Sequence, residues 1–335
     1  MVEILIKKIM HLFENQYFKE ITTNLKTTDM HDLKSIYTKI RRTLKTVAKD
    51  CFDSDGNHRY YPNAPSMSDL EIISLTLAAE SLQITSENLL WSKIQKDYPF
   101  LFPNLVHRTS YNRRKKALRY IFLVCTERLA LPLVNDNDSF IIDSIPVPTC
   151  KIIREKFSKA CRRPEMDEVL ANKGYNAIMG GYFIGYKIHL ITTESGIYRD
   201  LLVTSANVHD NAFLKEISMD DEHLYRRELL GDRAYIGHST QLRLFEETGL
   251  TVHVPYRRNQ KDYQAYNPIL KLKRKTIEVV FSQYCDEYAI RQNYAKRFDG
   301  FEIRIITKVA AKTFKQYWNY LNNRPINQTK HALAA

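Results

Sequence analysis

Apolar residues in the first 130 positions recur at helical spacing, and glycine is almost absent there. The stripe is clearest near the N-terminus, where apolar side chains stand three or four residues apart, the period of one helix face: Ile4, Leu5, Ile9, Leu12 and Phe13. Residues 52–66, FDSDGNHRYYPNAPS, interrupt the pattern with turn formers. The region is therefore predicted to contain several separate helices.

Two helix starts can be placed within this region. Ser68 with Glu71 three residues later forms a capping box before the apolar stretch IISLTLAA. A further helix is expected from about Thr109, with the basic run RRKK at 113–116 on one side. Short helices that end in a basic one fit a DNA-binding helical domain. A purely structural cap fits them equally well, and both interpretations stay open.

After Asn135 the pattern changes to strands. Residues 139–148, SFIIDSIPVP, form a β-branched run that ends in prolines, which predicts a strand. Residues 182–193 and 197–206 flank the turn sequence ESG and predict a β-hairpin.

Helices and strands then alternate. HDNAFLKEI begins a helix, and residues 228–237 read as a strand followed by a glycine-containing turn. HSTQLRLFEETG is a helix that ends at Gly249. LTVHVPYR is a strand, and a long helix is expected over 274–296. This alternation predicts a mixed sheet with helices on its faces.

Charge narrows the possible partners. The 335 residues, enough for two or three units, carry 50 Lys and Arg against 38 Asp and Glu, a net charge of +12. Such a balance favours nucleic acid as a partner, although basic proteins without such a partner are common. A second basic cluster, KLKRK, lies at 271–275.

The cysteine pattern and the absence of other motifs argue against several classes of protein. The five cysteines contain no CxxC pair, which argues against a disulfide framework or zinc ribbon and fits a reducing cytoplasm. The N-terminus has no signal-peptide core, and no apolar run approaches the roughly 20 residues of a membrane span. A P-loop, a GxGxxG loop, a GxSxG elbow and an HExxH pair are all missing. We therefore expect a cytoplasmic protein with no nucleotide cofactor and no membrane.

Three carboxylates are candidates for chemistry. Asp143 interrupts an apolar strand, where an unpartnered charge would be costly. Asp232 follows a second strand at its carboxyl end, where ligand crevices form in α/β sheets. Glu278 lies four residues after Arg274 on a predicted helix. Each alone has an ordinary explanation as a turn former, cap or surface ion pair, but together they provide the oxygen ligands that Mg²⁺ prefers and the basis for metal-assisted phosphoryl transfer.

Four strings carry a family resemblance: IIDSIPVP, GYFIGYKIHLITTESGIYRDLLVTSANVHD, GDRAYIG and RKTIEVVFSQ. In this order and spacing they resemble DDE transposases of the IS4-like superfamily, and more narrowly the insertion sequence 982 group. The resemblance covers roughly residues 65–320. It implies an α/β fold: an RNase H-like core, with a mixed five-stranded sheet flanked by helices, behind an all-helical N-terminal domain. The implied division is residues 1–134 for the helical DNA-binding domain, 135–320 for the DDE catalytic domain and 321–335 for a basic C-terminal tail.

By the same resemblance Asp143, Asp232 and Glu278 are the catalytic, metal-binding triad, with Mg²⁺ as cofactor and Mn²⁺ as its substitute. The implied substrate is DNA, both the terminal inverted repeats of an insertion sequence and the target. Because two ends must be held together, a homodimer or larger synaptic complex is expected. Should Glu278 prove dispensable, Asp286 and Glu287 are the next candidates on the same helical stretch.

The family signature has an Arg upstream of its last acid, and Arg274 fits, while the Tyr of that signature has no obvious counterpart. We predict DNA contacts from the two basic clusters and one later arginine: Arg113, Arg114, Lys115, Lys116, Lys271, Lys273, Arg274, Lys275 and Arg291. Possible neighbours of the active site are His209, Arg233 and Tyr235. Asp210 is expected to cap the helix that follows it.

Two other functions remain open at this stage. One is a catalytically inactive, domesticated transposase that binds specific DNA without cutting it. The other is an RNase H-like nuclease acting on RNA or on RNA–DNA hybrids. All three acids are present, which favours the active transposase over the first, and the long helical N-terminal part suits recognition of DNA ends better than the second.

Overall fold

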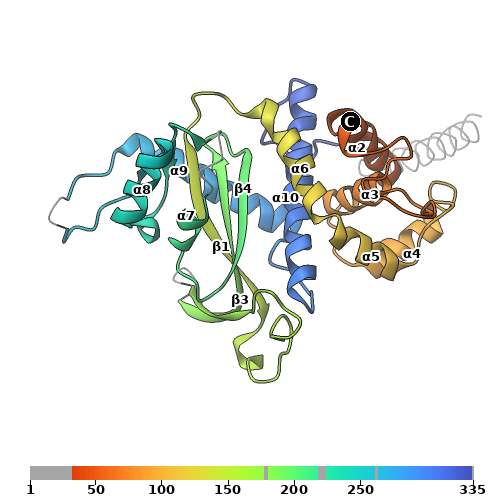
Figure 1. Ribbon diagram of the computed structural model, residues 1–335, viewed down its shortest axis with the longest axis horizontal. Coiled ribbons are helices and arrows are strands. Elements are labelled where there is room, and N and C mark those ends of the chain that lie inside the picture. The colour runs from red at the N-terminus through yellow and green to blue at the C-terminus, as the bar shows by residue number, and fades with distance from the viewer. Residues whose placement is uncertain (1–31, 177–179, 218–223, 261–262, 334–335) are drawn as a thin grey trace, which may run out of the picture.

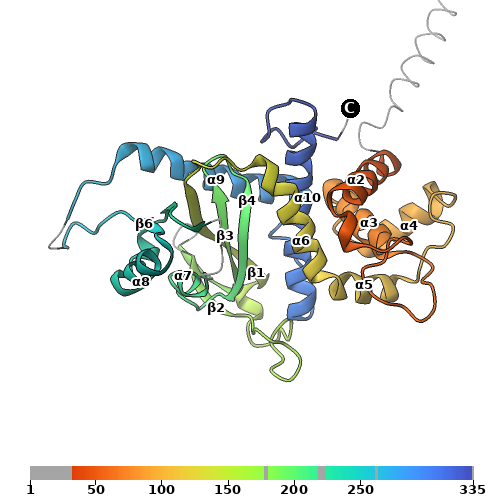
Figure 2. The same ribbon diagram turned by 45° about the horizontal axis from the view of Figure 1, so that its top comes forward.

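A computed structural model describes residues 32–176, 180–217, 224–260 and 263–333 of the chain. Figure 1 shows a sheet with helices on one side of the molecule, a group of helices on the other, and the long helix α10 between them. Figure 2 shows the same order after the turn about the horizontal axis. The predicted helical stripe from Ile4 to Phe13 lies outside the described residues.

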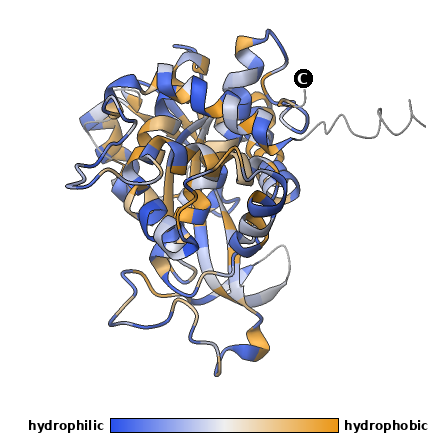
Figure 3. Ribbon diagram, turned by 90° about the vertical axis from the view of Figure 1, so that its right-hand side faces the viewer, coloured by the Kyte–Doolittle hydropathy of each residue, from blue (hydrophilic) through white to orange (hydrophobic). Residues whose placement is uncertain are grey.

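The N-terminal part is helical, as predicted. Its helices are α2 (Leu33–Val47), α3 (Asp69–Ser81), α4 (Glu87–Asp97), α5 (Arg108–Ala117) and α6 (Arg119–Ala130), with single 3₁₀ turns at Lys49–Cys51 and Leu131–Leu133. Hydrophilic and hydrophobic residues alternate around the helices of this part, as Figure 3 shows. Helices with an apolar face, such as α2, bury that face against the group, whereas α3 is buried on nearly all sides.

Helix α3 forms the centre of this group. The predicted capping box is confirmed, because the Ser68 hydroxyl accepts a hydrogen bond from the Glu71 amide and the Glu71 carboxylate accepts one from the Ser68 amide. Twelve residues of α3 are buried, and the helix packs against α2, α5 and α10.

The sheet is mixed, as predicted, but it has six strands rather than five. The strands are β1 (Phe140–Cys150), β2 (Asn172–Asn176), β3 (Gly181–Thr193), β4 (Tyr198–Ser205), β5 (Glu228–Leu230) and β6 (Thr251–His253). Strand β3 is antiparallel to β1, β2 and β4, whereas β1, β5 and β6 run parallel. The additional strand, β2, pairs with the first residues of β3, and its sequence NKGYN has no apolar alternation that could have predicted it.

Four α-helices and two 3₁₀ turns complete the described part of the second half: α7 (Ala212–Glu216), α8 (His238–Thr248), α9 (Pro268–Tyr288), α10 (Phe298–Leu321), and turns at Ile152–Arg154 and Arg233–Tyr235. Gly249 ends α8 in a left-handed conformation, as predicted. The prediction of 274–296 for α9 was wrong at both ends. Asn267 caps the helix with Pro268 at its first position, and Ala289, at φ 48°, ends it.

The two faces of the sheet cover separate hydrophobic cores. Along β1, Ile141, Ile145 and Val147 belong to the larger core, which includes residues of α9 and α10. Phe140 and Ile142 point to the opposite face and pack with residues of α7 and α8. This alternation follows from the two-residue period of a strand, and it places Asp143 in the row that faces α9.

Helix α10 connects the two parts of the molecule. It packs against α3 and α6 on one side and touches α9 and β4 on the other. Its buried face includes lysines: Lys308 Nζ lies 2.6 Å from the Glu80 carboxylate, and Lys312 and Lys315 lie over the rings of Tyr284 and Tyr288 of α9, at 5.6 and 5.0 Å. These charged positions break up the apolar pattern, which explains why the sequence did not predict so buried a helix.

Three of the four basic residues at 113–116 form ion pairs within the protein. Arg114 lies 2.5 Å from the fully buried carboxylate of Asp69, and Lys115, also buried, lies 2.5 Å from Glu87. Lys116 reaches Asp299 of α10 at 2.9 Å. Of the four, Arg113 is exposed. Three of these side chains therefore stabilise the helical part.

None of the helices in the described ranges is long and apolar enough to cross a membrane.

The Arg114–Asp69 pair gives a prediction about stability. Arg114→Ala should lower the free energy of unfolding by about 3–5 kcal/mol, because it leaves a buried carboxylate without its counter-charge. The matched control, Arg113→Ala, should change it by less than about 0.5 kcal/mol because that side chain is exposed. Urea unfolding followed by circular dichroism measures both. Equal stability of the two variants would contradict the structural role of Arg114.

Candidate active site

Asp143 lies on β1, and Asp232 lies two residues beyond the end of the neighbouring parallel strand β5. Phe140 pairs with Leu229 in the register of β1 and β5. Asp143 lies three residues after Phe140, and Asp232 three residues after Leu229. The register therefore brings the two carboxylates side by side where β5 ends, which is where ligands bind in sheets of this kind.

The backbone around each aspartate holds its carboxylate. Asp143 Oδ1 accepts a hydrogen bond from the Ser144 amide at 2.7 Å. Asp232 Oδ1 accepts one from the Ala234 amide at 2.8 Å and so caps the 3₁₀ turn Arg233–Tyr235. Gly231 leaves room for that turn, since a Cβ there would lie 3.1 Å from the Tyr235 ring and 3.3 Å from Ile142.

Glu278 is linked to Asp143 by Arg274, which forms an ion pair with each of these two carboxylates. Ile277 and Val280 bury one side of α9, and Arg274 extends from the helix towards β1. Its guanidinium lies 3.6 Å from Asp143 Oδ2 and 3.7 Å from Glu278 Oε1. The Glu278 side chain is 62% exposed, so it stands at the open side of the site.

The surroundings of Asp143 disfavour its ionised form. Burial raises the pKa of Asp143 to about 7, and the nearby carboxylates of Asp232 and Asp210 contribute to this rise; the Ser144 amide and Arg274 act in the opposite direction. Two close carboxylates repel each other unless a cation lies between or beside them. The guanidinium of Arg274 supplies part of that positive charge.

The donor set fits a hard divalent cation. Asp143, Asp232 and Glu278 supply oxygen ligands only, which suits Mg²⁺. Within the described ranges, no group of three or more Asp, Glu, His or Cys side chains is close enough to form a ready metal cluster. The Arg274 guanidinium lies within ion-pair distance of both Asp143 and Glu278 and balances part of their negative charge.

A second charged group lies behind the site, and no pattern in the sequence predicted it. Lys187 Nζ lies 2.9 Å from Asp210 Oδ1 and donates to the Val208 carbonyl. His189 is buried beside them, with Nε2 2.8 Å from Thr204 Oγ1, and burial lowers the pKa of His189 to about 4. The predicted capping role of Asp210 was wrong: α7 begins after Asn211, and the Asp210 carboxylate pairs with Lys187 instead.

The predicted neighbours of the site differ in their surroundings. Tyr235 is fully buried, and its hydroxyl has no hydrogen-bond partner among the residues that the structure describes. Burial, together with the charges of Asp143, Asp210 and Asp232, holds the pKa of Tyr235 well above its usual value. Arg233 and His209 are exposed. Of the three, Tyr235 thus lies within electrostatic reach of the carboxylates from the interior.

The basic residues of α9 and the segment after it divide into two groups. Lys273 is held by Glu194 at 2.6 Å and by the Ser139 hydroxyl at 3.2 Å. Lys271, Lys275 and Arg291 are exposed. Contacts of these residues with DNA stay a prediction.

The raised pKa of Asp143 predicts a pH-dependent stability. The folded protein holds this proton more tightly than the unfolded chain, so the stabilisation is complete below about pH 4 and is lost as the pH rises through about 7. Without divalent metal, Asp143→Asn should therefore be more stable than the wild type at pH 8, with the difference fading towards pH 4. Thermal unfolding over this range measures it, and Asp136→Asn, at an exposed position, should show no such trend. A pH-independent difference for Asp143→Asn would contradict the raised pKa.

Comparison with known families agrees with this geometry. Residues 135–293, which contain β1, β5, α9 and all three carboxylates, match the family model described as a transposase DDE domain. Comparison with curated proteins gives no match, and comparison with solved structures gives none. Residues 135–293 of this chain are therefore similar to a transposase DDE domain.

Proposed function

We propose that the protein is a DNA transposase of the IS4-like superfamily, close to the insertion sequence 982 group, that cleaves the inverted-repeat ends of its element and joins them to target DNA. One observation carries the proposal: Asp143 on β1 and Asp232 just after the parallel strand β5 lie close together, and Arg274 pairs with both Asp143 and Glu278 of α9. A binding protein without catalysis has no need for this concentration of acids.

The sheet supports an RNase H-like core for this enzyme. The path β4–β3–β1–β5–β6, with β3 antiparallel to β1 and with β1, β5 and β6 parallel, has the first aspartate on its central strand. The next aspartate follows the adjacent strand. The third acid comes from α9, which packs on the face of Asp143, and Arg274 of that helix lies 3.6 Å from Asp143 and 3.7 Å from Glu278.

In the proposed mechanism Asp143, Asp232 and Glu278 would hold Mg²⁺, or Mn²⁺ in its place. Such an ion, when bound, would supply Lewis-acid activation of the attacking water or 3′-hydroxyl and charge stabilisation for the leaving oxygen. Asp143 must be ionised to contribute, and a bound cation favours its ionised form. Arg274 would then be free to bind two oxygens of a phosphate group bidentately. Lys271 and Lys275 are exposed on the same helix, and in this mechanism they contact the phosphates that flank the cleavage site. No covalent protein intermediate is needed. Because two DNA ends have to be joined, we propose a homodimer or larger synaptic complex.

The triad can be tested by cleavage of a labelled duplex that carries the element's own ends, in Mg²⁺ or in EDTA. Asp143→Ala, Asp232→Ala and Glu278→Ala should each reduce the rate by about a thousandfold or more, because each removes an oxygen ligand of the catalytic ion. Asp286→Ala, at an exposed acid on the same helix, should retain activity and serves as the matched control.

Three results would redirect the proposal. Tight end binding without cutting in any divalent metal would favour the inactive, DNA-binding protein. Cutting of RNA–DNA hybrids in preference to duplex DNA would favour the RNase H-like nuclease. Full activity of Glu278→Ala would move the third ligand to Asp286 or Glu287.

Arg274 allows a separate prediction, because its positive charge holds down the pKa of Asp143. Arg274→Ala should slow cleavage by about a hundredfold, because the phosphate loses its bidentate partner, and should move the acidic limb of the pH–rate profile to higher pH. Arg274→Lys keeps the charge and should restore the profile more than the rate. A lower rate with an unmoved profile in Arg274→Ala would exclude its effect on Asp143.

A further inference from the structure

Helix α2 presents a basic surface, of which Arg41 lies 3.7 Å from the Glu71 carboxylate. It contains five Lys and Arg residues and no Asp or Glu. Its apolar stripe, which includes Leu33, Ile36 and Ile40, is buried. Arg42 and Lys45 are exposed on the outer side and form no ion pair within the part of the chain that the structure describes. A helix face with this composition attracts polyanions.

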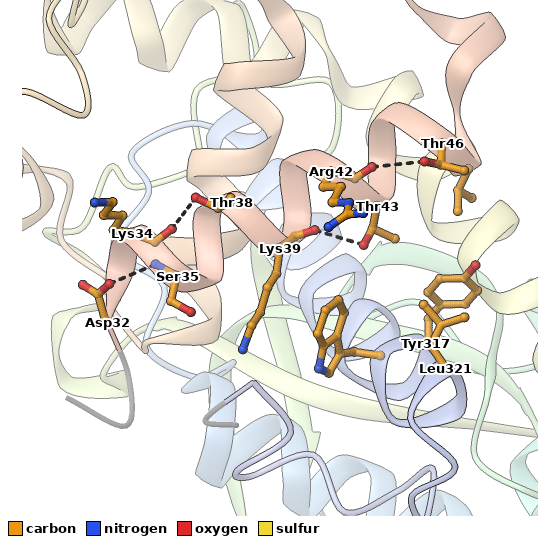
Figure 4. Close-up of a pocket in the computed structure, with 12 residues that line it drawn as sticks. Asp32, Lys34, Ser35, Thr38, Lys39, Arg42, Thr43, Thr46, Tyr317 and Leu321 are labelled. Atoms are coloured by element: carbon orange, nitrogen blue, oxygen red, sulfur yellow. Dashed lines mark hydrogen bonds between the residues drawn. The ribbon is translucent and has the colours of Figure 1, made fainter. Parts of the chain in front are cut away.

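A groove runs between α2 and the last turns of α10. Its volume is about 840 Å³, and the α10 wall consists of Tyr317, Trp318 and Leu321. Figure 4 shows the Lys39 side chain extending from α2 into this space, with Arg42 farther along the same helix and Tyr317 and Leu321 opposite. The groove therefore has a basic wall and an aromatic wall.

Positive charges gather at one end of the groove. Lys39 Nζ lies 5.4 Å from the centre of the Trp318 ring and donates to the Leu333 carbonyl at 3.0 Å. Burial and the nearby charge of Arg324 lower the pKa of Lys39. The acid that lines the groove is Asp32, and its carboxylate already accepts hydrogen bonds from the Tyr98 hydroxyl and the Ser35 amide.

The C-terminal segment 322–333 connects this groove to the helix that carries Glu278. Gln283 of α9 donates to the Asn327 carbonyl at 2.8 Å, and the Thr329 hydroxyl donates to Glu287 of α9, also at 2.8 Å. At its far end the Leu333 carbonyl accepts from Lys39 of α2. Arg324 and Lys330 are exposed along it, so basic side chains follow one another from α9 to α2.

From these contacts we infer that the α2–α10 groove, together with segment 322–333, binds one sugar–phosphate strand of duplex DNA. Lys39, Arg42 and Arg324 contact phosphates, and Tyr317 and Trp318 pack against the sugars. The inference rests on the proposed function, since it assigns the surface on which the DNA beyond the cleavage site lies. A polyanion neutralises the positive charge of this surface, whereas an apolar helix from a second copy would bring no counter-charge.

The test compares two triple variants with the same change in charge. Lys39→Gln, Arg42→Gln and Arg324→Gln are combined in the first, and the control combines Lys156→Gln, Lys159→Gln and Lys215→Gln, which are exposed positions on the β1–β2 loop and α7. Binding of a labelled duplex in EDTA, which prevents cutting, is measured by fluorescence anisotropy at several salt concentrations. Circular dichroism confirms that both variants fold.

The groove variant should bind at least about tenfold more weakly near 0.1 M salt. Its log–log salt slope should fall by about one for each phosphate that no longer has a cationic partner, about three in all. The control should keep the wild-type slope. Equal losses of affinity in both variants, or none in either while the wild type still cleaves, would overturn the assigned surface and leave the transposase proposal intact. A wild type that neither binds nor cuts the duplex would overturn both.

A second measurement observes the groove directly. Trp91 and Trp318 are the two tryptophans of the chain, so Trp91→Phe leaves Trp318 as the fluorescent reporter. Duplex DNA should quench this signal at the same midpoint as the anisotropy. Unchanged fluorescence at saturation would overturn the contact. A change in sedimentation rather than in DNA affinity for the groove variant would assign the groove to a second copy of the chain and would also overturn it.

Discussion

The repulsion between Asp143 and Asp232 is the constraint on which the site depends. The parallel register of β1 and β5 places both carboxylates at one level, and the larger core buries the first of them. Such an arrangement is stabilised by a proton on one of the carboxyl groups or by positive charge close by. Arg274 provides it, and Arg274 can reach Asp143 because Ile277 and Val280 hold α9 against the sheet. The charge balance at Asp143 thus depends on how α9 packs against the sheet.

The two faces of the sheet contribute differently to this arrangement. The face towards α9 carries Asp143 and the arginine that joins it to Glu278. On the other face, Lys187 and Asp210 form an ion pair beside the buried His189. The Tyr235 ring belongs to the core of this second face, yet the charges of the carboxylates raise the pKa of its hydroxyl. The site is therefore supported from both sides, and its polar support extends beyond the three acids.

Basic clusters in this chain have two distinct roles. Arg114 and Lys115 are buried against Asp69 and Glu87, and Lys308 is buried against Glu80. These charges position helices, since removing one partner of such a pair leaves the other uncompensated in the interior. The outer face of α2 is also basic, but its Arg42 and Lys45 are exposed and form no ion pair within the described residues. Composition alone does not distinguish buried basic residues from exposed ones; the distinction depends on whether an acidic side chain of another element lies beside them.

Local sequence signals determined much of the fold and the identity of the acids. The Ser68–Glu71 capping box, the β3–β4 hairpin, the end of α8 at Gly249 and the strand around Asp143 each depend on residues a few positions apart, so their patterns could be read directly. The type and order of the three carboxylates belong to the same category. Strand β2, by contrast, exists because β3 offers an open edge.

Only the tertiary structure decided which charges are buried, exposed or shared. Arg114 meets a partner 45 residues away and Lys308 one that is 228 residues away, so no local pattern could distinguish them from solvated lysines and arginines. The same holds for the level alignment of Asp143 with Asp232 and for the placement of Arg274 between Asp143 and Glu278. Backbone preferences and side-chain periodicity act over one or two turns, whereas electrostatic partners are chosen by packing between elements that are distant in the chain.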